Sequence, residues 1–157
     1  MDALITFCGQ YLIILPVLMT AYLLYKLDTK LKKQYLLLVI AGGLLALVLA
    51  LVASHFYSNP RPFLSDGVTP KFSSATDNGF PSDHTLLAAV LAFASLVYSR
   101  KLGVLLLVVA VLVAWGRVAG GVHHGVDVIA SFALAGLAVL ITKNLLARSL
   151  PQKLKDA

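Results

Sequence analysis

The sequence has little charge. Charged residues make up 13% of its 157 residues and hydrophobic residues 59%, whereas soluble domains carry about 25% charged residues. This composition excludes an ordinary soluble domain and indicates that the chain is surrounded by lipid. The length fits one domain, covering residues 1–157.

Cysteine is almost absent as well. The single cysteine, Cys8, lies in an apolar run, so an internal disulfide is excluded and the paired cysteines of zinc sites are missing. We expect Cys8 to behave as a small buried apolar residue. The apolar run around it lacks a basic n-region and is too long for a signal peptide, so we expect a retained spanning helix.

Long apolar runs are abundant. A helix needs about 20 apolar residues to cross a bilayer core of about 30 Å. Segments that meet or approach this length predict an all-α integral membrane bundle of five transmembrane helices, at residues 3–25, 35–57, 82–98, 102–119 and 126–146.

The positions of the basic residues predict how the bundle is oriented. Most Lys and Arg lie on one side of it: Lys26, Lys30, Lys32, Lys33, Arg100, Lys101, Lys143, Arg148, Lys153 and Lys155. The positive-inside rule makes this side, with the C-terminus, cytoplasmic, and anionic lipids attract such a rim. The N-terminus then faces outward, and the net charge of +6 needs no nucleic-acid partner to explain it.

Ionisable residues also gather on the predicted outer side. They are Arg61, Lys71, Arg117, Asp83, Asp127, His55, His84, His123 and His124. Such groups at helix ends on one membrane face are candidates for a functional site.

The first outer motif holds an arginine between two prolines. Pro60 and Pro62 fix the backbone and remove donors, so the second helix ends here and Arg61 lies at a rigid exit. The planar guanidinium suits bidentate contact with phosphate. The alternative is an arginine that reaches lipid headgroups.

The second outer motif opens the third helix. Ser82 and Asp83 are residue types that cap helix N-termini, and such a terminus favours an anion. His84 lies in the first turn, and a histidine titrates near neutral pH, so it is a candidate proton donor. The alternative is a helix cap with an incidental interfacial histidine.

The third outer motif joins the fourth and fifth helices. His123 and Asp127 are four residues apart and share a helix face if the helix begins at or before His123. A carboxylate on one ring nitrogen leaves the other as a nucleophile, and Gly120 and Gly121 let the backbone approach a ligand. A structural His–Asp pair and a metal site that adds His124 are the alternatives, although adjacent histidines on a helix point about 100° apart.

Together, the three motifs resemble those of the type 2 phosphatidic acid phosphatase family: Lys-x6-Arg-Pro, Pro-Ser-Gly-His and Ser-Arg-x5-His-x3-Asp. The sequence has, in this order, Arg61-Pro62, then Pro81-Ser82-Asp83-His84, then Arg117 with His123 and Asp127 at the family's spacing. The Pro-Ser-Asp-His variant is similar to the bacterial undecaprenyl-diphosphatase branch, which is linked to bacitracin resistance.

The resemblance implies a lipid phosphatase of the bacterial inner membrane, with its active site at the extracytoplasmic surface and no metal or cofactor. Its substrate would be a lipid phosphate or diphosphate, with undecaprenyl diphosphate favoured. By this resemblance, His123 attacks phosphorus and forms a phosphohistidine, Asp127 orients His123, and His84 protonates the leaving oxygen. Arg61, Arg117 and the N–H groups near Ser82 would hold the phosphate oxygens.

The chain departs from the family at three motif positions. Ser54 stands in place of the lysine, Gly116 in place of the serine and Asp83 in place of the glycine. We include Asp83 in the predicted substrate-binding set, and Lys71 as the candidate replacement for the missing cation. Two alternatives remain open: a lipid phosphotransferase, and a protein that binds lipid phosphate without hydrolysing it.

Overall fold

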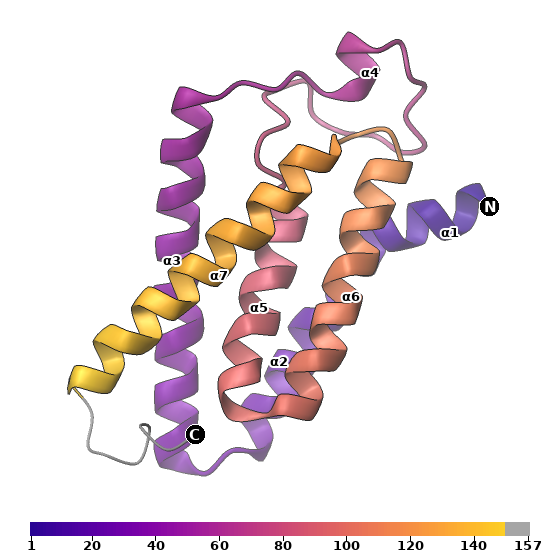
Figure 1. The fold of residues 1–157 in the computed structure, drawn as a ribbon. Helices are drawn as coiled ribbons and strands as arrows, with labels where there is room; N and C mark the ends of the chain where they lie inside the picture. The colour runs from indigo at the N-terminus through magenta and orange to yellow at the C-terminus, as the bar shows by residue number, and fades with distance from the viewer. Residues whose placement is uncertain (150–157) are drawn as a thin grey trace.

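The structure of the protein is a computed structural model, in which the backbone of residues 1–149 and the side chains up to Ala147 are described. The predicted cytoplasmic Lys153 and Lys155, and the side chain of Arg148, lie outside this part. The described chain is helical, in the order α1 (Asp2–Thr6), a π-helical turn η1 (Phe7–Tyr11), α2 (Ile14–Lys26), α3 (Thr29–Phe56), α4 (Pro62–Ser65), α5 (Asp83–Tyr98), α6 (Arg100–Ala119) and α7 (Gly125–Ser149) (Figure 1).

Helix α5 forms the centre of the bundle. It contacts α2, α3, α6 and α7, and its fully buried alanines are Ala88, Ala89, Ala92 and Ala94. Small residues allow neighbouring helices to approach closely where lipid provides no hydrophobic drive between them. One buried polar contact links α5 to α3, since the hydroxyls of Tyr35 and Ser95 lie 2.8 Å apart.

The first predicted span is not one straight helix. The stretches Asp2–Tyr11 and Ile14–Lys26 are bent by 44°. Proline has no N–H and cannot make the regular helical hydrogen bond, so no such bond from Pro16 reaches the carbonyl of Leu12, and the N–H of Leu15 bonds to it instead at 3.0 Å. The bend turns α1 and η1 across the end of α6, as Figure 1 shows.

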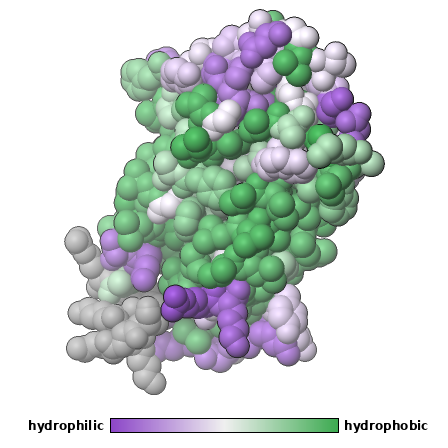
Figure 2. All heavy atoms as spheres, turned by 45° about the vertical axis from the view of Figure 1, so that its right-hand side comes forward, coloured by the Kyte–Doolittle hydropathy of each residue, from purple (hydrophilic) through white to green (hydrophobic). Residues whose placement is uncertain are grey.

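The helix lengths support part of the predicted membrane topology. Among the described residues, α3, α6 and α7 are long and apolar enough to cross a membrane, the bent pair can form a fourth span, and α5 is shorter. Figure 2 shows a broad apolar belt between polar ends, which is the surface of a helical bundle embedded in a membrane. The number of five spans stays a prediction.

The three motifs lie at one end of the bundle. The α3–α5 connection, which includes α4, and the α6–α7 turn both lie there, while the α2–α3 and α5–α6 turns lie at the opposite end (Figure 1). The basic residues that precede Tyr35 and follow Tyr98 are therefore separated from the motifs by the length of the bundle.

Candidate active site

The exit of α3 brings Arg61 to the centre of the polar end. Helix α3 ends at Phe56, and Arg61 caps α4, whose first residue is Pro62, as the two prolines of the motif predicted. An isolated antiparallel bridge pairs Pro60 with Asn78. This pairing holds the α3 exit against the segment that leads into α5.

The guanidinium of Arg61 is buried, and each of its three nitrogens has a hydrogen-bond partner. Its Nη1 lies 3.1 Å from His123 Nε2 and also donates to the carbonyl of Val122 at 3.2 Å and the hydroxyl of Ser74 at 3.1 Å. Asp77 Oδ1 lies 2.8 Å from Nη2 and 3.1 Å from Nε. The hydrogen bonds from Arg61 lower the pKa of the Asp77 carboxyl, so Asp77 stays ionised beside the guanidinium.

The α6–α7 turn brings a second arginine to the same histidine. Gly121 has φ +71°, a left-handed conformation that glycine adopts most easily. Arg117, in the last turn of α6, is buried and places Nη2 3.3 Å from His123 Nε2. Its Nη1 donates to the carbonyl of Gly9 at 3.2 Å, and its charge lies 5.3 Å from the ring centre of Phe72, within the range of a cation–π contact.

The ring of His123 is held in one tautomer. Its Nδ1 lies 2.8 Å from the carbonyl oxygen of Gly79 and 3.4 Å from Asp127 Oδ2. A carbonyl oxygen only accepts hydrogen bonds, so Nδ1 carries the proton and Nε2 keeps its lone pair, directed toward Arg61 and Arg117. Burial, together with these two cations, lowers the pKa of His123 despite the opposing effect of Asp127.

The carboxylate of Asp127 is completely buried behind His123. Helix α7 begins at Gly125, after His123, so the two residues do not share a helix face. The contact forms because the carboxylate turns back on the loop, where Oδ2 accepts from the backbone N–H of His124 at 2.8 Å. Oδ1 accepts from Asn59 Nδ2 at 2.7 Å.

The start of α5 places His84 in the site and Ser82 behind it. Ser82 is the N-cap and is fully buried. Its hydroxyl accepts from Thr85 at 3.2 Å, its carbonyl accepts from Ser131 at 2.9 Å, and its N–H lies 3.4 Å from the carbonyl of Asp127. Ser82 therefore braces α5 against α7, and the first turn beyond it carries Asp83 and His84.

These groups surround a polar cavity of about 300 Å³. It is lined by Gln10, Arg61, Ser73, Ser74, Ala75, Asp77, Asp83, His84, Arg117 and His123. Five of the predicted site residues therefore line one cavity. Asp127 and Ser82 lie behind that lining.

Lys71 lies apart from the cavity. Its Nζ bonds to Asp2 at 3.3 Å, with both side chains exposed. The loop turns this way because the backbone N–H of Lys71 donates to the carbonyl of Gly120 at 2.9 Å. The structure therefore does not bring Lys71 to the position expected for a phosphate ligand.

Some residues of the site were not predicted. Asn59, Asp77 and Gly79 contact the motif side chains directly. Asn59 and Gly79 open the first and second motifs, and Asp77 lies just before the second. Their type carried no signal for a role, and only the folded loop shows which partner each contacts. Within residues 1–147, no group of three or more His, Cys, Asp and Glu is arranged to hold a metal ion.

The comparisons with known proteins cover the part of the chain that holds the three motifs. A model of the PAP2 superfamily matches residues 32–150. Undecaprenyl-diphosphatase BcrC of Bacillus subtilis (strain 168) is 31% identical over 135 residues, which are 86% of this chain and 69% of the relative. The protein YbjG of Escherichia coli (strain K12) is 29% identical over 156 residues, 98% of this chain and 77% of the relative.

A solved structure has the same fold. The crystal structure of LpxE from Aquifex aeolicus superposes with a TM-score of 0.72 at 22% identity, and covers 91% of this chain and 85% of that chain. With the family match over residues 32–150 and the three motifs around one cavity, these comparisons show that the chain belongs to the PAP2 superfamily.

Proposed function

We propose that this chain is a membrane lipid phosphatase that hydrolyses an isoprenoid diphosphate, with undecaprenyl diphosphate as the favoured substrate, through a phosphohistidine on His123. The observation that carries the proposal is the environment of His123 Nε2. This unprotonated nitrogen lies 3.1 Å from one guanidinium nitrogen and 3.3 Å from another. A nucleophile between two cations is suited to attack a phosphoryl group, whose oxygens those cations stabilise.

The first step transfers the terminal phosphoryl group to the protein. Nε2 of His123 bonds to phosphorus while the bond from phosphorus to the bridging oxygen breaks. His84, which lines the same cavity, takes up a proton when the anionic diphosphate binds beside it and gives that proton to the leaving lipid monophosphate. Arg61 and Arg117 turn from Nε2 to the equatorial phosphate oxygens, where negative charge is spread during transfer.

The second step releases phosphate. Water gives a proton to His84 and attacks phosphorus, the P–N bond breaks, and inorganic phosphate leaves with neutral His123 restored. The carboxylate of Asp127 and the carbonyl of Gly79 hold the Nδ1 proton throughout. They stabilise the positive charge that the imidazole ring gains when Nε2 bonds to phosphorus.

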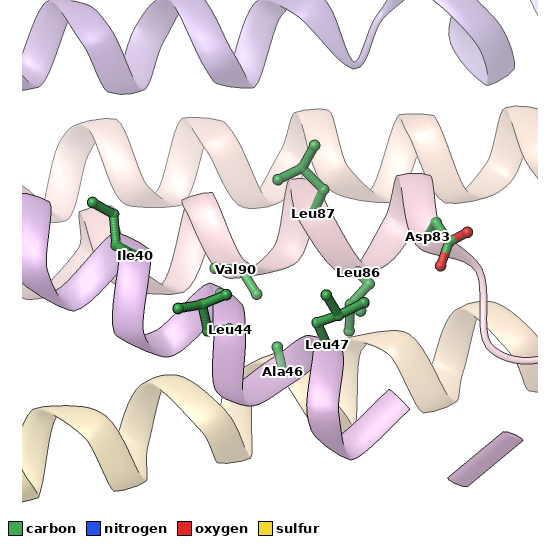
Figure 3. Close-up of a pocket in the computed structure, with 9 residues that line it drawn as sticks. Ile40, Leu44, Ala46, Leu47, Asp83, Leu86, Leu87 and Val90 are labelled. Carbon is green, nitrogen blue, oxygen red and sulfur yellow. The ribbon is translucent and has the colours of Figure 1, made fainter. Parts of the chain in front are cut away.

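An apolar groove beside the cavity supports a substrate with a long hydrocarbon chain. The groove has a volume of about 500 Å³ and lies between α3 and α5, lined by Ile40, Gly43, Leu44, Ala46, Leu47, Asp83, Leu86, Leu87 and Val90 (Figure 3). Asp83 stands at the end of this groove and also lines the polar cavity. A lipid can therefore place its chain in the groove while its headgroup reaches His123.

The charge distribution supports an extracytoplasmic active site. The cavity lies at the end of the bundle opposite the basic turns that carry Lys30 and Arg100. Since basic turns stay in the cytoplasm, the N-terminus and the site face outward, as expected for a bacterial plasma membrane protein. The relatives' names support the same class of substrate, because BcrC is named as an undecaprenyl-diphosphatase.

One observation favours the alternative of slow or absent hydrolysis. The family lysine is replaced by Ser54, whose hydroxyl bonds to the carbonyl of Leu51, and Lys71 pairs with Asp2. A site with one cation fewer would hold a lipid phosphate less well in the transition state. It could also retain the phosphoryl group on His123 until another lipid hydroxyl accepts it.

A phosphate-release panel tests the proposal. Purified protein in nanodiscs is given undecaprenyl diphosphate, phosphatidic acid, phosphatidylglycerophosphate or a lipid A phosphate, with a chelator present. We expect most phosphate from undecaprenyl diphosphate, and none from His123→Asn, while the control His55→Asn stays active. Full activity in a folded His123→Asn variant would overturn the mechanism, and dependence on an added metal would overturn the metal-free assignment.

The same panel separates the alternatives. Label from the terminal phosphate that appears in a second lipid identifies a phosphotransferase. Binding without turnover, with activity gained in Ser54→Lys, identifies a lipid-phosphate binding protein. Hydrolysis by the wild type that Ser54→Lys does not improve excludes that second alternative.

A further inference from the structure

Asn59 contacts both groups that hold the Nδ1 proton of His123. Its side-chain Nδ2 donates to Asp127 Oδ1 at 2.7 Å. Its backbone carbonyl accepts from the N–H of Gly79 at 3.0 Å, and the carbonyl of that same glycine accepts from His123 Nδ1 at 2.8 Å. One residue therefore fixes the carboxylate and the carbonyl on which the tautomer of His123 depends.

The amide of Asn59 has one possible orientation. A carboxylate accepts hydrogen bonds and donates none when it is ionised, so the atom of Asn59 that faces Asp127 must be the nitrogen. This NH₂ group has a second hydrogen, and His124 Nδ1 lies 3.1 Å away. His124 Nδ1 must then be the acceptor.

The orientation of the Asn59 amide also fixes the tautomer of His124, which lies nearer the surface. With Nδ1 accepting, the ring proton of neutral His124 lies on Nε2, which is 3.1 Å from Asp66 Oδ2. Asp66 is an acceptor, so each donor in the chain Asp66, His124, Asn59 and Asp127 meets an acceptor. The backbone N–H of His124 also donates to Asp127 Oδ2 at 2.8 Å, so His124 contacts the buried carboxylate directly and through Asn59.

We propose that Asn59 and His124 are positioning residues that hold Asp127 and Gly79 so that the nucleophilic nitrogen of His123 points into the cavity. Neither lines the cavity of about 300 Å³, so they act through His123 and not on the substrate. This inference rests on the proposed function, in which His123 Nε2 is the nucleophile. It adds an amide and a second histidine to the three motifs.

The kinetic test compares replacements that keep or remove one acceptor. In Asn59→Ala, we expect kcat to fall about 100-fold, the scale of a small misplacement at the reacting centre, with KM within about threefold because no cavity-lining group changes. The oxygen of an asparagine at 124 can take the place of Nδ1. We therefore expect His124→Asn to keep most of the activity and His124→Leu to lose about tenfold in kcat.

Matched controls are available away from the network. Asn144 is exposed at the other end of α7, and His55 is exposed outside the cavity lining, so Asn144→Ala and His55→Leu should match the wild type. Equal activities of His124→Asn and His124→Leu would overturn the role of His124. If Asn59→Ala changes KM and leaves kcat intact, Asn59 does not have the proposed role.

A second measurement does not need turnover. The chain has four histidines, so ¹⁵N-histidine spectra in nanodiscs report the His123 tautomer. We expect nearly complete Nδ1–H in the wild type and a mixture with Nε2–H in Asn59→Ala. An unchanged tautomer in a folded Asn59→Ala protein would contradict the positioning role. If the wild type releases no phosphate but this shift occurs, the proposed function fails and the positioning inference stands.

Discussion

Asp77 forms an ion pair with Arg61, and its Oδ1 lies 2.8 Å from Nη2 and 3.1 Å from Nε. The carboxylate side chain is 66% exposed while the guanidinium side chain is 8% exposed. The pair therefore stands at the mouth of the cavity with its anionic member toward solvent. A phosphate that binds Arg61 must compete with this carboxylate.

Neutralising Asp77 should tighten substrate binding. Because the carboxylate of this pair is exposed and screened by water, we assign the pair the value of about 0.2–1 kcal/mol that is typical of surface ion pairs, so Asp77→Asn should lower KM up to about fivefold with little change in kcat. Steady-state phosphate release measures both constants. Asp28→Asn, at the opposite end of the bundle, keeps the N-cap of α3 and serves as the control. A large rise in KM for Asp77→Asn would instead mean that Asp77 holds Arg61 in its working position.

The pKa of His123 should lie below the ordinary histidine value. Burial first, and then Arg117 and Arg61, lower its pKa from 6.5, while the contact with Asp127 raises it. The neutral imidazole should thus persist as pH falls through 6.5 and be lost on protonation at a lower pH. An NMR titration of His123 in the substrate-free protein measures the midpoint. Asp127→Asn, which removes a raising contact, should shift the midpoint further down, and a wild-type midpoint above 6.5 would contradict the argument.

The convergence of the motifs was predictable because each lies at a helix end, and alternate turns of a spanning bundle lie on the same side. Spacing and helix ends thus indicated that Arg61, His84, Arg117 and His123 belong together, and they do line one cavity. His123 and Asp127 also lie in contact, at 3.4 Å. The expectation that they share a helix face was wrong, because α7 begins only at Gly125 and that start depends on how the loop folds.

The loop contacts were beyond prediction from sequence. Lys71 is a cation in the expected loop, yet a backbone hydrogen bond to Gly120 directs it toward Asp2. The bend at Leu12 could be expected from Pro16, since proline removes a specific helical donor. No such local rule identifies Asp77 or Asn59, whose partners lie 16 and 68 residues away.

Removing Lys71 should have little effect on activity. Its ammonium pairs with Asp2, and the two side chains are 41% and 71% exposed, so the charge is well solvated. We expect Lys71→Ala to keep KM within about twofold, whereas Arg61→Ala should lose about 100-fold in kcat/KM because the buried cation beside His123 Nε2 is removed. Phosphate release under identical conditions compares the two. A tenfold rise in KM for Lys71→Ala would show that the loop moves to the substrate.

Restoring the family's serine at position 116 should destabilise this chain. A Cβ on Gly116 would lie 2.7 Å from the Cα of Gly9 and would overlap its backbone nitrogen, because η1 packs directly on α6. Overpacking of this kind costs about 1–3 kcal/mol. Thermal unfolding of Gly116→Ser in detergent should show the loss. Gly43→Ala is the control, since its added Cβ meets only Val90, at 4.0 Å, and equal midpoints for the two variants would contradict the packing argument.

Filling the groove between α3 and α5 should weaken the binding of a long hydrocarbon chain and leave the contacts to the phosphate headgroup unchanged. Gly43 lines the groove without a positive φ, so a phenylalanine there fits the helix backbone and projects beside Val90. If two methylene contacts are lost at about 0.8 kcal/mol each, KM for undecaprenyl diphosphate should rise about 15-fold.

The KM for a short-chain diphosphate should stay the same in Gly43→Phe, because this substrate leaves the middle of the groove empty and depends on the headgroup contacts alone. Both substrates are measured with Gly43→Phe and with Val108→Phe, whose side chain is 53% exposed on α6. An equal loss on both substrates in Gly43→Phe would mean that the bulk disturbs the start of α5 and the position of His84. No loss on either would place the chain of the substrate outside this groove.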